Sequence, residues 1–121
     1  MMRALLILAH GSRREASNDE VRELARMLAS RLDLSFSRVD AAFLELTSPT
    51  IDQAVDEAVA AGATQVVLYP YFLAAGRHVA EDIPAIVDRC RSRHPAVAID
   101  LRPYLGASPA LIELLINELS A

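Results

Sequence analysis

Two histidines and a glutamate occupy equivalent places in this chain, because each comes at or just after the end of a strongly apolar run. The three residues are His10, Glu45 and His78, and the runs before them span 4–9, 39–44 and 66–73. If those runs are parallel strands, their carboxyl ends meet at one edge of a sheet, where open α/β sheets bind ligands. Imidazole and carboxylate groups suit divalent ions such as zinc, cobalt and iron, and histidine also exchanges protons near neutral pH. The pattern therefore predicts a metal site or an acid–base site at this edge.

Each of these residues also has an ordinary structural explanation when it is taken alone. His10 would be hydrogen-bonded to a neighbouring loop, Glu45 would be a solvated surface residue, and His78 would cap a helix. The two histidines are far apart in sequence and match no local metal-binding signature. A shared site therefore depends on the fold that brings the residues together.

Small polar and basic residues stand beside these positions. Ser12, Arg13 and Arg14 follow the first histidine, and Arg77 precedes the second. Arginine forks pair well with carboxylates, and a helix N-terminus adds positive partial charge. We expect these residues to form a basic, substrate-binding mouth for an anionic small molecule, although arginines are also common in loops without such a role.

Apolar periodicity predicts a helix after each strand. Positions three and four apart lie on one face of a helix, and four stretches of the chain follow that spacing. The four faces are 21, 24, 25, 28 and 32; 51, 54, 55, 58 and 59; 79, 83, 86, 87 and 90; and 111, 114, 115 and 119. A fourth strand is expected at 97–101, between the last two helices.

Prolines indicate where these helices begin. Ser48-Pro49 supplies an expected cap and first-turn proline for the second helix, and Ser108-Pro109 starts the last one. Pro84 has to lie in the first turn of the third helix, because a proline in a helix interior costs about 3 kcal/mol. That helix should start between 79 and 82, which places His78 at or just before its N-terminus.

Strands that alternate with amphipathic helices indicate right-handed crossovers and a parallel sheet. We expect an α/β fold, a flavodoxin-like three-layer sandwich with a four-stranded parallel sheet in the order 2-1-3-4. In that order the first strand lies between the second and the third, so His10 has Glu45 on one side and His78 on the other. With 121 residues, the chain is expected to form a single domain over 1–121.

The composition of the chain argues against some classes of binding partner. The 12 basic and 16 acidic residues leave a formal charge of −4, so there is no basic excess to neutralise the phosphates of a nucleic acid. The N-terminal apolar run is too short to span a membrane. Cys90 is the only cysteine and falls on an apolar helix face, which favours a core residue over a nucleophile. We expect a cytoplasmic protein that binds neither nucleic acid nor membranes.

Several motifs around these residues resemble those of the class II tetrapyrrole chelatases. They are Leu8-Ala9-His10-Gly11-Ser12-Arg13, Phe43-Leu44-Glu45 with Pro49 following, the long stretch 72–84, and Pro103-Tyr104-Leu105-Gly106. The resemblance extends over essentially the whole chain, and the stretch 72–84 is its most specific part. The group that is most similar is the small single-domain sirohydrochlorin cobaltochelatases and ferrochelatases.

That resemblance implies a lyase that inserts a divalent metal into sirohydrochlorin without ATP, in cobalamin or sirohaem biosynthesis. It implies catalytic roles for His10, Glu45 and His78, with the two histidines holding the metal or accepting protons. Co²⁺, Fe²⁺ or Ni²⁺ would be a substrate, and no permanent cofactor is expected. Longer members contain two α/β lobes with the site between them. This chain resembles the one-lobe form, which works as a homodimer with its sites near the subunit interface.

Two other functions fit parts of the pattern. A single lobe with half of a site would suit a non-enzymatic carrier of a metal or a tetrapyrrole. Ala9-His10-Gly11 also resembles the nucleophile segment of a histidine-type phosphatase. Those enzymes expect an arginine immediately before the histidine, and Ala9 stands there instead.

Overall fold

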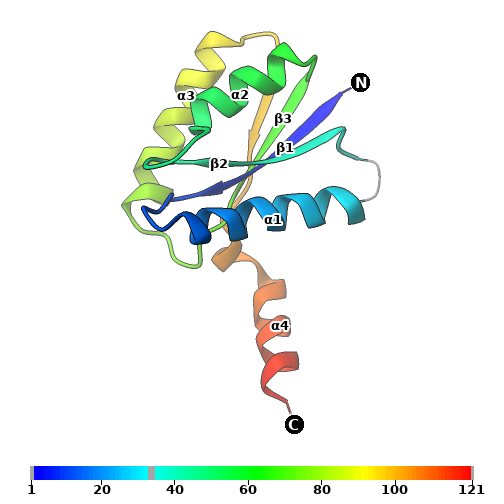
Figure 1. The fold of residues 1–121 in the computed structure, drawn as a ribbon, viewed down its shortest axis with the longest axis vertical. Helices are drawn as coiled ribbons and strands as arrows, with labels where there is room; N and C mark the ends of the chain where they lie inside the picture. Colours follow the sequence, from blue (N-terminus) through cyan, green and yellow to red (C-terminus); the bar gives the residue numbers. More distant parts are fainter. Residues whose placement is uncertain (1, 33–34, 121) are drawn as a thin grey trace.

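A four-stranded parallel sheet forms the centre of the molecule in a computed structural model that describes residues 2–32 and 35–120 (Figure 1). Its strands are β1 (Arg3–Ala9), β2 (Arg38–Phe43), β3 (Gln65–Pro70) and β4 (Ala98–Leu101). They lie in the order β2-β1-β3-β4, which confirms the predicted topology.

The central strand β1 brings the carboxyl ends of its two neighbours level with its own. Leu8 pairs with Ala42 of β2 and with Pro70 of β3, and Ala9 pairs with Phe43. All β1 residues from 4 to 9 are buried, because the strand has a neighbour on each side and helices on both faces. The segments that follow β1, β2 and β3 therefore leave the sheet at the same edge.

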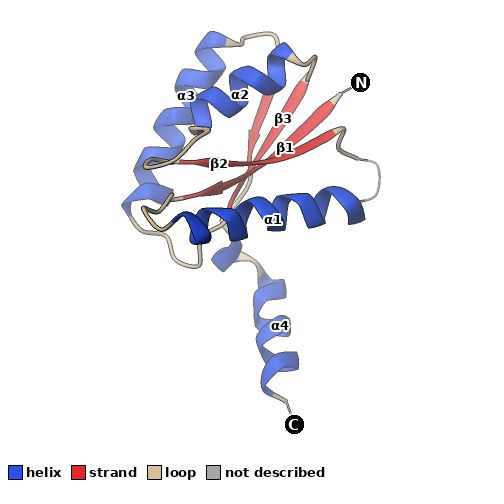
Figure 2. Ribbon diagram, in the orientation of Figure 1, coloured by secondary structure: helices blue, strands red, loops and turns tan. Residues whose placement is uncertain are grey.

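Helices cover the two faces of the sheet unequally (Figure 2). Leu5 and Ile7 of β1 face α1 (Glu15–Arg31), whereas Leu6 and Leu8 pack with α2 (Ile51–Ala60) and α3 (Ile83–Arg93). This alternation follows from the two-residue period of a strand. Full burial of each such side chain is worth roughly 1.5–3 kcal/mol, so both layers contribute to holding the sheet.

The predicted cap of α2 is wrong, because Thr50 and not Ser48 caps this helix. The Thr50 hydroxyl accepts a hydrogen bond from the Gln53 backbone N–H, and the Gln53 side chain accepts one from the Thr50 N–H. This reciprocal pair satisfies two backbone donors at once, and only the three-residue spacing from Thr50 to Gln53 permits it. Pro49 consequently lies before the helix and not in its first turn.

The third helix begins with one π turn, η1 (His78–Asp82), before α3 continues from Ile83. The Ile83 N–H donates to the carbonyl of His78, five residues earlier. Pro84 accounts for the wider turn, since it has no N–H and its ring would clash with the carbonyl of Ala80 in a regular helix. The predicted start between 79 and 82 falls inside this turn, and such turns are frequent at functional sites.

The third strand is shorter than predicted, because it ends at Pro70 and not at 73. Its neighbours β1 and β4 end at Ala9 and Leu101, so little of the sheet is left to pair with 71–73. Tyr71, which the run 66–73 placed in the predicted strand, lies beyond β3 and is 42% exposed.

The last helix, α4 (Pro109–Leu119), projects away from the sheet (Figure 1). Ser108 caps it, as predicted, and a short 3-10 turn, η2 (Leu105–Ala107), joins it to the body. Its apolar residues are largely exposed and add nothing to the core of the chain. Within the described ranges, no helix is long and apolar enough to cross a membrane.

Candidate metal centre

The side chains of His10, Glu45 and His78 come together at the carboxyl edge of the sheet. Each offers one potential ligand atom, and these atoms all lie within 4.8 Å of one another. The Nε2 atom of His10 is 3.2 Å from Oε2 of Glu45, and the two imidazole centroids are 4.6 Å apart. Two imidazoles and a carboxylate at these separations form a donor set suited to a divalent transition-metal ion.

Backbone pairing beyond the ends of β1 and β2 holds the first two of these residues together. The Leu44 N–H donates to the carbonyl of Ala9 at 3.0 Å, and the Glu45 N–H donates to the carbonyl of His10 at 3.1 Å. Gly11 makes this approach possible, because a Cβ atom there would overlap the carbonyl oxygen of Glu45. Its φ of +94° also belongs to the region that favours glycine.

The residue after Glu45 has a strained backbone. Leu46 has a φ of 70°, which costs a residue other than glycine about 1–2 kcal/mol. Its side chain is nevertheless 51% exposed, so burial does not offset that cost. Arg22 of α1 holds the same loop through hydrogen bonds to the Thr47 hydroxyl at 3.0 Å and the Ser48 carbonyl at 3.1 Å. Strain of this kind is concentrated at functional sites.

The π turn orients His78 through a carboxylate that the sequence analysis missed. The Nδ1 atom of His78 lies 2.7 Å from Oδ2 of Asp82, so this hydrogen bond places the ring proton on Nδ1. The Nε2 atom then has the lone pair that a metal ion needs. The available signal was the spacing of four residues between a histidine and an aspartate at a helix start, which places both on one face.

Asn18 shapes the loop that follows His10, and the sequence analysis missed it too. Its side chain accepts from the Ser12 N–H at 2.9 Å and donates to the Ser12 carbonyl at 2.8 Å, and the residue is 1% exposed. The Ser12 hydroxyl accepts from the Arg14 N–H. The signal was a polar residue three positions before Val21, on the apolar face of its helix.

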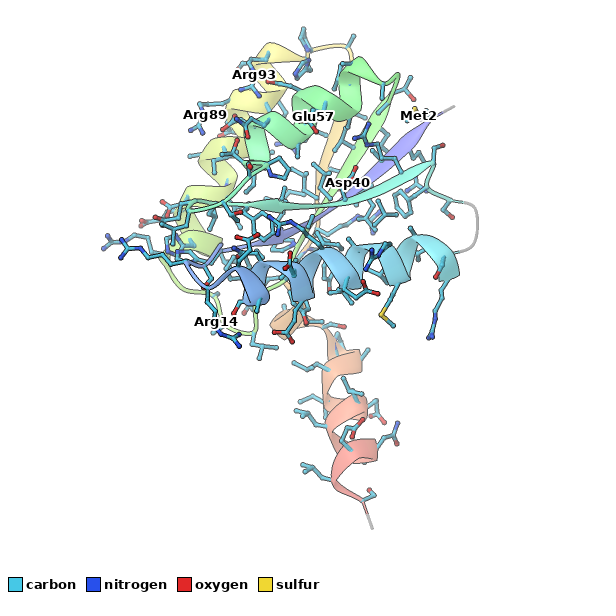
Figure 3. All side chains as sticks on the ribbon, in the orientation of Figure 1. Met2, Arg14, Asp40, Glu57, Arg89 and Arg93 are labelled. Carbon is cyan, nitrogen blue, oxygen red and sulfur yellow. The ribbon has the colours of Figure 1, made fainter. Side chains whose placement is uncertain are left out.

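The three arginines singled out in the sequence are only loosely held. Arg14, on the loop between β1 and α1 (Figure 3), donates to the hydroxyl of Ser17, and Arg77 is 3.7 Å from Glu81 with its side chain 81% exposed. For the exposed side chain of Arg13, the described residues supply no hydrogen bond or ion pair. All three guanidinium groups can therefore turn toward an anionic ligand.

The cluster of His10, Glu45 and His78 opens onto a groove of about 300 Å³. Its lining includes Leu44, Glu45, His78, Asp82, Ile86 and Arg89. The side chains of His10, Glu45 and His78 are 44%, 54% and 42% exposed, so one side of this cluster is open to solvent. A larger groove of about 910 Å³ follows the edge strand β2 past Asp40 and Glu57 (Figure 3), and no histidine is among its described lining residues.

The remaining histidine and the cysteine belong to an ion-pair cluster between α2 and α3, near Arg89 and Arg93 in Figure 3. His94 Nε2 lies 2.6 Å from Oδ1 of Asp56, and this hydrogen bond, with a second from Arg93, lowers the pKa of that carboxyl. Cys90 is buried, and its burial raises the pKa of the thiol. Cys90 is thus a core residue, as predicted.

Comparison with known proteins identifies the family of this chain. The family model CbiX matches residues 4–121. A sirohydrochlorin ferrochelatase of Priestia megaterium is 29% identical over 119 residues, which are 98% of this chain and 44% of that protein. The chain spans about half the length of the curated relatives it matches, sirohydrochlorin ferrochelatases and cobaltochelatases among them.

Two solved structures extend this likeness to three dimensions. The cobalt complex of the sirohydrochlorin chelatase SirB from Bacillus subtilis subspecies spizizenii has a TM-score of 0.84 and 26% identity over 98% of this chain and 50% of its own. A CbiX protein from Marinobacter aquaeolei VT8 has a TM-score of 0.75 and 31% identity over 96% of this chain and 95% of its own. From the family match over nearly its whole length, the chain belongs to the CbiX family.

Proposed function

We propose that this chain inserts a divalent metal ion into sirohydrochlorin without ATP, as a metal-inserting lyase of cobalamin or sirohaem biosynthesis, and that residues 1–121 act as one chelatase domain. The observation that supports this most directly is the approach of the His10, Glu45 and His78 ligand atoms to within 4.8 Å. The names of the relatives, sirohydrochlorin ferrochelatase and cobaltochelatase, agree with it.

The reaction assigns a task to each of these groups. A divalent ion replaces two pyrrole N–H protons of the macrocycle, so the site must hold the ion, strip its water and take up two protons. His10 and His78 hold the ion through imidazole nitrogens. Glu45, 3.2 Å from His10, accepts a proton or orients the ring that does. As the ion passes from the imidazole nitrogens to the macrocycle, the lone pairs that it leaves can accept the displaced pyrrole protons.

The metal is a substrate of this reaction, and no permanent cofactor is involved. Co²⁺ and Fe²⁺ are the first candidates, because relatives are named for each and SirB has been solved with cobalt. Ni²⁺ is the third, since imidazole and carboxylate ligands accept it as well.

The carboxylates of sirohydrochlorin supply a reason for basic residues on a protein of net charge −4. We assign Arg13, Arg14 and Arg77 to these carboxylates, with Ser12 beside them as a further polar contact. The loose packing of the three guanidinium groups supports this assignment, because little must be broken for them to bind the substrate.

Assembly and location belong to the same proposal. We expect a homodimer in the cytoplasm, with each metal centre near the subunit interface. The open side of the centre supports this, because a binding site normally buries most of its ligand and a groove of about 300 Å³ admits only one edge of a tetrapyrrole.

The test is an anaerobic absorbance assay of sirohydrochlorin with Co²⁺, with and without catalytic amounts of the protein, repeated with Fe²⁺ and Ni²⁺. We expect a faster change to the metallated spectrum than in the spontaneous reaction. His10→Ala and His78→Ala should abolish the acceleration while tetrapyrrole binding remains. His94→Ala is the matched control, because this histidine pairs with Asp56 on the outer helices.

One outcome would replace the proposal, and another would remove one residue from it. A spectral change that needs stoichiometric protein and shows no turnover would identify a carrier of the metal or the tetrapyrrole. Normal turnover in His78→Ala would remove that residue from the reaction.

A further inference from the structure

The loops that carry His10 and Glu45 are both tied to the same helix, α1. This helix lies beside β2 and begins a few residues after the end of β1 (Figure 1). The Nε2 atom of His10 and the Oε2 atom of Glu45 are 3.2 Å apart, although the two residues follow different strands. Contacts that fix both loops relative to α1 therefore also fix the separation of these two side chains.

Asn18 ties the loop after β1 to the start of α1. Its side-chain amide accepts a hydrogen bond from the Ser12 N–H at 2.9 Å and donates one to the Ser12 carbonyl at 2.8 Å. The same amide nitrogen lies 3.2 Å from Oε2 of Glu15 and donates to it. Asn18 is 1% exposed, and a polar side chain that is buried to this degree needs its partners. The loop after β1 is therefore held in one position relative to the helix.

Arg22, one turn further along α1, ties the loop after β2 to the same helix. Its Nη2 atom donates to the Thr47 hydroxyl at 3.0 Å and to the Ser48 carbonyl at 3.1 Å. Its Nη1 atom donates to Oε1 of Glu15 at 2.5 Å. The hydrogen bonds from Arg22 and Asn18 lower the pKa of the Glu15 carboxyl, so this residue joins them as a charged acceptor. A continuous set of hydrogen bonds through α1 thus connects the two loops.

The guanidinium group of Arg22 also packs against the end of β2. Its Cζ atom lies 5.1 Å from the centroid of the ring of Phe43, the last residue of that strand. The Phe43 N–H donates to the Pro49 carbonyl at 2.9 Å, so the loop 44–49 returns to the strand end from which it left. A planar group that stacks on an aromatic ring and donates in several directions is a geometry that lysine does not reproduce.

The strained residue Leu46 lies between Glu45 and the residues that Arg22 holds. Its φ of 70° is a conformation that persists only where the surrounding structure enforces it. The hydrogen bonds of Arg22 to the two following residues supply that restraint. If they are lost, Leu46 can relax to an ordinary φ, and this rotation displaces the neighbouring Glu45.

We propose that Arg22 is a positioning residue of the metal centre, which acts by holding the carboxylate of Glu45 beside His10. Arg22 lines the groove along β2 and is not among the lining residues of the groove beside His78, so it acts from outside the site. This inference rests on the proposed function for the tasks of His10 and Glu45, and adds to it a residue that touches neither the metal nor the tetrapyrrole.

The test is a Co²⁺ titration of the purified chain without tetrapyrrole, followed by absorbance. We expect Arg22→Ala to lower the affinity by about tenfold, and Arg22→Lys to restore little of it. Arg26→Ala is the matched control, because Arg26 lies one turn further along α1, pairs with Glu23 and is 76% exposed, and it should leave the affinity unchanged.

A double-mutant cycle separates positioning from a general loss of stability. In a Glu45→Ala background, Arg22→Ala should change the Co²⁺ affinity by less than about twofold, because the group through which it acts is absent. A merely structural effect would persist in that background. Thr47→Val provides a second variant that keeps Arg22 and its ion pairs within α1 and removes one hydrogen-bond acceptor in the loop. We expect it to lower the affinity several-fold, even if Arg22→Ala fails to fold.

Three results would overturn the inference: equal affinities in the Arg22→Ala and Arg26→Ala variants, an undiminished effect of Arg22→Ala in the Glu45→Ala background, or a Thr47→Val variant with the affinity of the parent chain. A parent chain that binds no Co²⁺ would overturn the proposed function together with this inference. A parent chain that follows the expected pattern of Co²⁺ affinities but does not accelerate metal insertion would overturn the proposed function alone.

Discussion

The Nδ1 atom of His78 lies 2.7 Å from the Oδ2 atom of Asp82, at the two ends of a single π turn. The carboxylate accepts a hydrogen bond from the Nδ1–H group and so fixes the tautomer and the plane of the imidazole. Groups behind a metal-binding histidine commonly set its basicity in this way. Asp82 is therefore a positioning residue for the proposed metal centre, and it acts through His78.

Replacing Asp82 should weaken metal binding without unfolding the protein. We expect Asp82→Ala to lower the affinity for Co²⁺ by about 10–100-fold, the range typical of a lost partner behind a ligand. Asp82→Asn should lose less, because its amide oxygen still accepts a hydrogen bond. The measurement is a Co²⁺ titration without tetrapyrrole, followed by absorbance. Asp88→Ala, an exposed carboxylate of α3, is the control. Equal affinities in the Asp82 and Asp88 variants would show that the carboxylate does not position the ring.

Gly11 should tolerate no side chain, because of both its φ of +94° and the carbonyl of Glu45 beside it. We expect Gly11→Ala to lower the free energy of unfolding by roughly 2 kcal/mol or more and to displace Glu45 from His10. Chemical denaturation and the chelation assay measure the two effects. Gly76→Ala is a matched control, since a Cβ atom there meets nothing within 4 Å. A Gly11→Ala protein as stable as the parent would contradict the close approach of the loop after β1 to the loop after β2.

Leu46 combines a strained backbone with an exposed side chain, so its substitution should affect the stability of the protein and its binding of substrate differently. Asparagine adopts a positive φ more readily than leucine, and we expect Leu46→Asn to leave the melting temperature unchanged or to raise it. Leu46 directly follows Glu45 and its side chain is exposed, so we expect it to contact a bound tetrapyrrole. Loss of that contact should raise the KM for sirohydrochlorin up to about tenfold, which corresponds to ~1.4 kcal/mol. Met27→Asn removes a side chain of similar exposure from α1 and should change neither quantity. A lower melting temperature with an unchanged KM would assign Leu46 a purely structural role.

Acid should destabilise the contact between α2 and α3. Burial raises the pKa of Asp52, but hydrogen bonds from Arg89 and Arg93 outweigh this and lower it below the usual value. A lowered pKa in the folded state adds stability above the unfolded pKa of about 4, and that stability is lost as the pH falls through the folded pKa. The free energy of unfolding should therefore fall between about pH 5 and pH 2.

Denaturation curves across that range provide the check. Asp52→Asn should cost about 1 kcal/mol at neutral pH and flatten the acid limb of the profile, because the asparagine cannot titrate. Glu20→Gln on the exposed face of α1 serves as the control. An acid limb that is equally steep in both variants would place the titrating groups elsewhere.

The order of the strands and the location of the site could be predicted because they depend on local patterns and general topology. Apolar runs and periodic helices indicated a parallel sheet, and the flavodoxin-like strand order expected for it placed His10 between Glu45 and His78. Details that depend on which backbone N–H groups form which hydrogen bonds could not be predicted from these patterns. The cap at Thr50, the π turn and the early end of β3 each result from hydrogen-bond geometry that residue type alone does not specify.

By itself the sequence determined which candidate ligand residues gather at one edge of the sheet, since strand and helix periods dictate which residues are buried and where each strand ends. Only the tertiary structure decided how close the three side chains approach, that Asp82 hydrogen-bonds His78, and that Asn18 holds the loop after His10. The tertiary structure also decided where α4 lies relative to the sheet. An apolar helix face predicts that the helix packs against another surface. Which surface that is depends on the path of the chain after Ser108, and here that path leads away from the sheet.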